Sequence, residues 1–128
     1  MTRKTCASTR PTCHLASQPF CRDSIAGVVL QCPIMSGGSV LLGASTAAWA
    51  RPLDIFTNYA KLPLVSRPVA IMHGTEDTVV PCDNGRKLHA LCQRPFDPFW
   101  VEGYGHNDLP AGPCDQYTAQ FIAMLSKQ

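Results

Sequence analysis

Three short runs of apolar residues, many of them β-branched or aromatic, recur along the chain with helical or irregular stretches between them. They cover residues 25–32, 69–72 and 99–101. The first run is nearly all apolar, as expected of a strand that is buried on both faces of a parallel sheet. Strands that alternate with helices form such a sheet. The sequence therefore predicts an α/β fold with about three parallel strands and flanking helices.

Helical spacing of apolar residues predicts the elements around this sheet. Two longer helices are expected, over about residues 84–92 and 114–127, and a short one around residues 58–64. Asp83 stands where it could cap the first of the longer helices. The apolar residues expected to face the core, and not a cofactor, are Leu88, Leu91, Phe121, Met124 and Leu125.

Composition excludes several classes of function. A formal net charge of +2 is too small to argue for nucleic acid, and no stripe of Lys and Arg interleaved with aromatics occurs. No stretch approaches the roughly 18 apolar residues of a transmembrane segment. Residues 1–24 are basic and rich in Ser and Thr, which loosely fits a mitochondrial presequence, but Pro11 and Pro19 would break its helix. A cytoplasmic location is therefore expected.

Seven cysteines are scattered along the chain without a C-x-x-C pair. An odd number without such spacing indicates neither a disulfide framework nor a zinc ribbon. Reduced thiols in a cytosolic protein are the favoured interpretation, and a metal site built from His14 and the early cysteines is disfavoured.

An acid and a histidine follow two successive apolar runs. Asp77 ends the segment His-Gly-Thr-Glu-Asp of residues 73–77, and His106 ends the glycine-containing segment of residues 102–106. Loops after parallel strands meet at one edge of the sheet. A carboxylate that holds one ring nitrogen of a histidine lets the other take a proton from a hydroxyl. Asp77 and His106 are thus the candidate catalytic residues, the alternatives being a turn acid and a surface histidine.

Three motifs together resemble a known family. They are residues 28–37, in which Val-Val-Leu leads to Pro33 and Ser-Gly, residues 73–77, and residues 100–108. From Val28 to its end the chain resembles the C-terminal portion of α/β-hydrolase-fold serine hydrolases, in particular the branch of protein depalmitoylases of α/β-hydrolase domain type 17. The resemblance makes residues 25–128 a partial α/β-hydrolase domain and residues 1–24 an irregular remnant of the region after the nucleophile.

The resemblance also implies a chemistry. Asp77 would be the acid and His106 the base of a serine triad that hydrolyses acyl esters or thioesters. The substrate of the intact enzyme would be an acylated protein or a small acyl ester, with palmitoyl groups on proteins as one candidate. No metal or organic cofactor is implied, and membrane association of the intact protein is left open.

The chain departs from the family at the nucleophile. No G-x-S-x-G elbow occurs in the sequence, and the serine position falls on Cys6, flanked by Lys4 and Ser8 in place of glycines. At 128 residues the chain is about half the usual 200–250 of the fold. We therefore expect a C-terminal fragment of a serine hydrolase that is inactive by itself. The alternative is a non-catalytic binding or regulatory module on a hydrolase scaffold.

A missing nucleophile strand has a consequence for folding. In the family that strand pairs with the one equivalent to residues 25–32, so this apolar strand is expected at an open sheet edge. We expect the chain alone to be poorly soluble or oligomeric, and Val29→Lys to reduce association.

Overall fold

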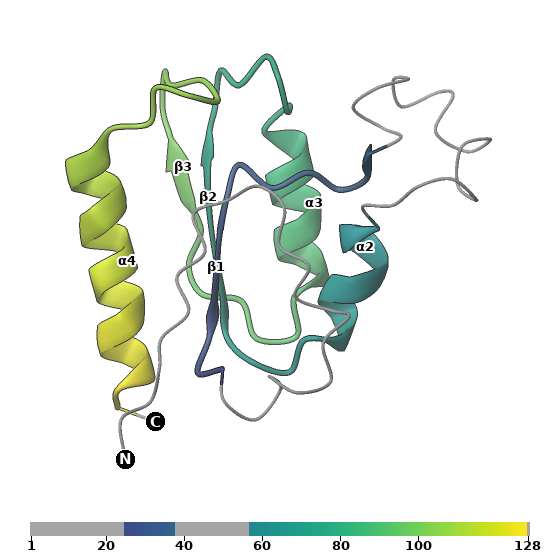
Figure 1. The fold of residues 1–128 in the computed structure, drawn as a ribbon, viewed down its shortest axis with the longest axis vertical. Helices are drawn as coiled ribbons and strands as arrows, with labels where there is room; N and C mark the ends of the chain where they lie inside the picture. Colours follow the sequence, from purple (N-terminus) through teal and green to yellow (C-terminus); the bar gives the residue numbers. More distant parts are fainter. Residues whose placement is uncertain (1–24, 38–56, 128) are drawn as a thin grey trace.

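A computed structural model describes residues 25–37 and 57–127 of the chain (Figure 1). Expectations about residues 1–24, among them the role of Cys6 and the position of His14, lie outside the described residues. The same holds for the alanine-rich stretch of residues 40–50.

The described strands form one parallel sheet in the order β1-β2-β3. Strand β1 covers Val28–Gln31, β2 covers Val69–Gly74 and β3 covers Phe99–Val101. Val28 pairs with Val69, and Met72 pairs with Phe99. The prediction of three parallel strands is confirmed. Strand β1 is shorter than the apolar run of residues 25–32, and β2 continues two residues past Met72 to Gly74.

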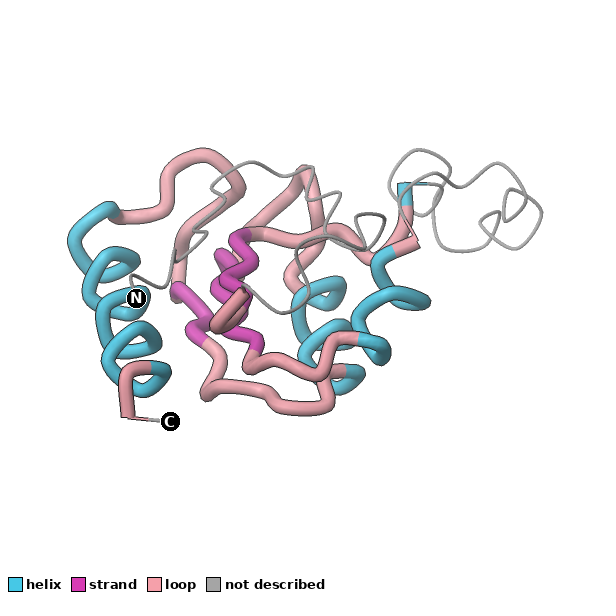
Figure 2. Tube along the Cα trace, turned by 60° about the horizontal axis from the view of Figure 1, so that its bottom comes forward, coloured by secondary structure: helices cyan, strands magenta, loops and turns pink. Residues whose placement is uncertain are grey.

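Helices cover both faces of this sheet. They are α2 (Asn58–Lys61), the 3-10 helix η3 (Leu62–Leu64), α3 (Asp83–Leu91) and α4 (Ala111–Leu125). Figures 1 and 2 show the strands as a middle layer, with α4 on one side and α2 and α3 on the other. Among the described helices none is both long and apolar enough to cross a bilayer.

The starts of two helices differ from the sequence prediction. Helix α4 begins at Ala111, before Pro113, because a proline in the first turn loses only an N–H that has no partner within the helix. The prediction that Asp83 caps α3 is wrong: Cys82 is the N-cap residue, no side chain caps the helix, and Asp83 is the first helical residue. Its charge still suits the positive end of the helix dipole.

Two hydrophobic clusters sandwich the central strand. Val69 and Ile71 of β2 join Leu88 of α3 on one face, whereas Ala70 and Met72 join Phe121 of α4 on the other. This alternation follows from the two-residue period of a strand. Met124 and Leu125 pack against the second cluster as expected.

One predicted core residue is not buried. Leu91, at the end of α3, is 38% exposed, whereas Leu88 is completely buried. Cys92, four residues after Leu88 and just past the helix, packs against the core in its place. The prediction for Leu91 was therefore wrong because the helical stripe continues at the i+4 position instead of at i+3.

Strand β1 has one neighbour among the described strands. The Val28 amide donates to the carbonyl of Pro68, just before β2, and the Cys32 amide donates to that of Met72 in β2. The alternate residues of β1 therefore direct their N–H and C=O groups to the other side, away from β2; they are Val29 and Gln31. Such an edge is a template for another strand. The Val29 side chain, however, packs against the α4 cluster, so Gln31, which is exposed, is the better place to introduce a charge.

We expect Gln31→Lys to reduce self-association of the chain by at least a few-fold, because a lysine on an edge strand opposes pairing with another strand. Sedimentation velocity over a range of concentrations measures this. Gln120→Lys makes the same charge change on the exposed face of α4 and should leave association as in the wild type. A wild-type chain that stays monomeric at all concentrations would contradict the open edge.

Candidate active site

Asp77 lies in the loop that follows β2, and its carboxylate is held by the backbone of that loop. The residue is only 6% exposed. Oδ1 accepts hydrogen bonds from the amides of Val79 (2.9 Å) and Val80 (2.7 Å). This is the turn that Asx residues form with the backbone two or three residues on. Because both backbone hydrogen bonds go to Oδ1, the second oxygen, Oδ2, can accept from other groups.

His106 lies in the loop after β3 and meets that second oxygen. Its Nδ1 is 2.7 Å from Asp77 Oδ2, and its side chain is 20% exposed. A carboxylate only accepts, so neutral His106 carries its proton on Nδ1 and keeps a lone pair on Nε2. The expectation that the two side chains lie at one edge of the sheet within hydrogen-bond reach is confirmed.

Backbone hydrogen bonds tie the two loops together. Thr75 donates its amide to the carbonyl of Val101 (3.0 Å), and Glu76 donates to that of Tyr104 (3.0 Å). Gly74 allows this approach, because a Cβ there would stand 2.2 Å from the Tyr104 carbonyl oxygen. Asp108 accepts from the Gly105 amide (2.7 Å) and so shapes the histidine loop.

The surroundings of Asp77 favour its ionised form. Burial by itself raises the pKa of a carboxyl group. Here the hydrogen bonds from the Val80 amide, His106 and the Val79 amide, together with the charge of His106, outweigh burial and hold the Asp77 pKa below its ordinary value of 3.8. Asp77 is therefore an anion at neutral pH, as the orientation and stabilisation of a protonated histidine require.

A second histidine contacts the same carboxylate from inside the protein. His73, completely buried in β2, places Nε2 2.8 Å from the Val80 carbonyl oxygen and 3.2 Å from Asp77 Oδ2. Both oxygens are acceptors, so Nε2 carries the proton. Nδ1 has no partner among the described atoms. A proton on Nδ1 would be buried without an acceptor.

No contact between His73 and Asp77 was predicted from the sequence. The only signal was the spacing of four residues from Asp77. His89 places Nε2 3.0 Å from the Phe96 carbonyl oxygen and its ring edge-on to Trp100. Glu76 is exposed.

Cys32, the first residue after β1, is a third side chain at Asp77. It is 2% exposed and adopts a positive φ of 43°, and its sulfur lies within 4.8 Å of the Asp77 carboxylate. Burial raises the pKa of the Cys32 thiol to about 11 against an opposing hydrogen bond with the backbone of Gly74, and the Asp77 charge adds to the increase. Sequence reasoning had grouped it with the other scattered thiols.

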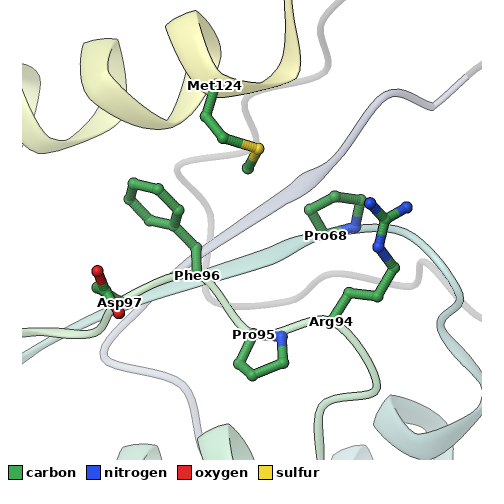
Figure 3. Close-up of a pocket in the computed structure, with 6 residues that line it drawn as sticks. All are labelled: Pro68, Arg94, Pro95, Phe96, Asp97 and Met124. Atoms are coloured by element: carbon green, nitrogen blue, oxygen red, sulfur yellow. The ribbon is translucent and has the colours of Figure 1, made fainter. Parts of the chain in front are cut away.

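A cavity of about 290 Å³ lies at the opposite end of the sheet. It is lined by residues that precede β2 and β3 and by Met124 near the end of α4 (Figure 3). Catalytic groups of parallel sheets stand at the carboxyl ends of strands. This cavity is therefore separate from the Asp77–His106 pair.

Gly85→Ala should lower the free energy of unfolding by about 1–3 kcal/mol, the range for overpacking a core. A Cβ at Gly85 would stand 2.6 Å from Nδ1 of His73 and would push that ring toward Asp77. Gly112→Ala is the matched control, because nothing lies within 4 Å of a Cβ there and the helical position gains about 0.5–1 kcal/mol. Urea unfolding measures both, and equal effects would contradict the packing of Gly85 on His73.

Asp77→Asn should lower the free energy of unfolding at pH 7 by about 1.5–3 kcal/mol, the range for hydrogen bonds to charged groups. Because the pKa of Asp77 is lower in the folded state, its contribution is complete above the ordinary value of 3.8 and is lost as the pH falls through the folded value.

The difference in the free energy of unfolding between the wild type and Asp77→Asn should therefore become smaller below pH 3.8. Urea unfolding at a series of pH values measures it. Glu76→Gln, an exposed neighbouring acid, should show little difference at any pH. A difference that grows toward acid pH would contradict the lowered pKa.

Comparison with known proteins identifies relatives of the chain. No family model matches the chain. It is 38% identical over 116 residues to alpha/beta hydrolase domain-containing protein 17B of Xenopus laevis, covering 90% of the chain, and 40% identical over 119 residues to protein 17C of Xenopus tropicalis, covering 93%. The chain belongs to the α/β-hydrolase family. It spans 38% and 34% of the lengths of these two relatives.

Solved structures support the fold. An esterase from Thermogutta terrifontis matches with a TM-score of 0.56 at 13% identity, over 81% of the chain and 58% of the esterase. An esterase from a Rhodococcus species matches with a TM-score of 0.52 at 18% identity, over 80% of the chain and 56% of the esterase. These matches confirm the α/β-hydrolase fold expected from the three motifs of the sequence.

Proposed function

We propose that this chain supplies the acid and the base of a serine-hydrolase triad that acts on acyl esters or thioesters. The observation that carries the proposal is the 2.7 Å contact between His106 Nδ1 and Asp77 Oδ2 at the carboxyl ends of β2 and β3. Two of the structural neighbours are described as esterases. Acyl groups on proteins are the substrate class suggested by the resemblance to the type 17 branch.

His106 and Asp77 have different roles in the proposed reaction. His106 Nε2 takes the proton of the attacking hydroxyl and later returns it to the leaving group. Asp77 keeps Nδ1 protonated and stabilises the imidazolium that forms. The backbone turn at Val79 and Val80 fixes the carboxylate, so the histidine is oriented before substrate arrives. The nucleophile has to come from a G-x-S-x-G segment, which this sequence does not contain.

A chimera tests the proposal. Residues 25–128 replace the matching region of the Xenopus laevis 17B relative, whose remaining part is expected to carry the nucleophile. We expect the chimera to hydrolyse a p-nitrophenyl ester and to react with a fluorophosphonate. His106→Ala should lower turnover by about 10⁶-fold and Asp77→Asn by about 10⁴-fold, the losses known for triads. The chain alone should show neither hydrolysis nor labelling.

Glu76→Gln is the matched control, because it removes the exposed carboxylate next to Asp77 and should leave turnover within a few-fold. Activity that survives His106→Ala would show that another group is the base. A chimera that melts cooperatively but is inert, beside an active parent, would favour the alternative of a non-catalytic binding or regulatory module. The absence of an elbow from the sequence is the observation behind that alternative.

A further inference from the structure

Three potential metal ligands converge where the strands end. Cys32 follows β1, Asp77 follows β2 and His106 follows β3. One ligand atom from each residue lies within 4.8 Å of the ligand atoms of the other two. In the described part of the chain this is the one group of three His, Cys, Asp or Glu residues with such spacing. The parallel sheet brings them together, because it places the carboxyl ends of all its strands at one edge.

The donor set suits one metal class. Thiolate sulfur, carboxylate oxygen and imidazole nitrogen are the three ligand types that bind Zn²⁺, and three protein ligands with water in the fourth position are common. A thiolate and a carboxylate together cancel the charge of a divalent ion, which lowers the cost of holding it at two residues exposed by 2% and 6%. We propose that Cys32, Asp77 and His106 form a Zn²⁺ site.

Asp77 and His106 have to separate only slightly to bind a metal ion together. Ligands about 2.0 Å from a tetrahedral Zn²⁺ stand about 3.3 Å apart, whereas His106 Nδ1 and Asp77 Oδ2 are 2.7 Å apart. His106 is the most exposed of the three and lies on a loop, so its ring can withdraw by this difference. Asp77 keeps its amide bonds on Oδ1 and its contact with His73, which orient the carboxylate toward the metal.

The protons balance in a way that has a consequence for catalysis. The Cys32 thiol loses its proton to solvent as sulfur binds the metal. His106 stays neutral, so with Nδ1 on the metal its proton resides on Nε2. Nε2 can then accept no proton from a hydroxyl, and Zn²⁺ inhibits the hydrolase. This inhibition rests on the proposed function, whereas metal binding itself does not.

Binding of Co²⁺ and Zn²⁺ to the full chain in a non-thiol reductant tests the site without any activity measurement. We expect one equivalent of Co²⁺ to give the near-ultraviolet absorption of a thiolate-to-cobalt bond, and Zn²⁺ to displace it. Cys32→Ser should abolish the absorption and weaken Zn²⁺ binding by about 100-fold or more, at least the loss known for supporting residues of metal sites. His106→Ala should weaken binding similarly.

Two controls address four of the other six thiols. Cys92→Ser changes a thiol that donates to the Leu88 carbonyl oxygen on α3, and it should bind as the wild type does. A chain with Cys6, Cys13 and Cys21 all changed to serine should also keep the absorption. Its loss in that chain, its persistence in Cys32→Ser, or no thiolate absorption in the wild type would overturn the proposal. If Cys32→Ser fails to fold by circular dichroism, unchanged binding in His106→Ala overturns it.

Discussion

The site and much of its surroundings depend on one buried anion. Asp77 carries its charge at a place that is 6% exposed, where an unpaired carboxylate would be very costly. Its oxygens therefore contact groups from several segments: two amides of its own loop, His73 of β2 and His106 beyond β3. The sulfur of Cys32, beyond β1, lies within 4.8 Å of the carboxylate. Satisfying this charge is what fixes the ends of the three strands relative to one another.

The same arrangement explains why small residues recur around it. Gly74 lets the histidine loop approach the end of β2, since any Cβ would meet the Tyr104 backbone. Gly85 on α3 lies directly against the buried ring of His73. Both glycines leave room for the polar network at the end of β2, beyond the two hydrophobic clusters that cover the faces of this strand. Packing in the middle of the sheet and hydrogen bonding at its edge thus depend on each other.

The sequence predicted the strands, the parallel sheet and the approach of Asp77 to His106, because periodicity and strand-end position are local signals with one geometric outcome. It did not predict the contacts of His73 and Cys32 with Asp77. Cys32 is 45 positions from Asp77 in the chain, and only the pairing of β1 with β2 brings them together. The exposure of Leu91 was not predicted because tertiary packing decides which residues of a helical stripe are covered. The uncapped start of α3 was not predicted because a sequence pattern locates the end of a helix only to within one or two residues.

The tautomer of the His106 ring, measured by NMR on the chain with ¹⁵N-labelled histidine, tests most directly whether Asp77 orients this histidine. We expect the neutral ring to carry its proton on Nδ1 and to give a downfield, slowly exchanging signal from it, both lost in Asp77→Asn. A neutral ring with its proton on Nε2 in the wild type, or an Nδ1–H signal that Asp77→Asn leaves unchanged, would contradict the claim that Asp77 holds His106 in the orientation of a general base.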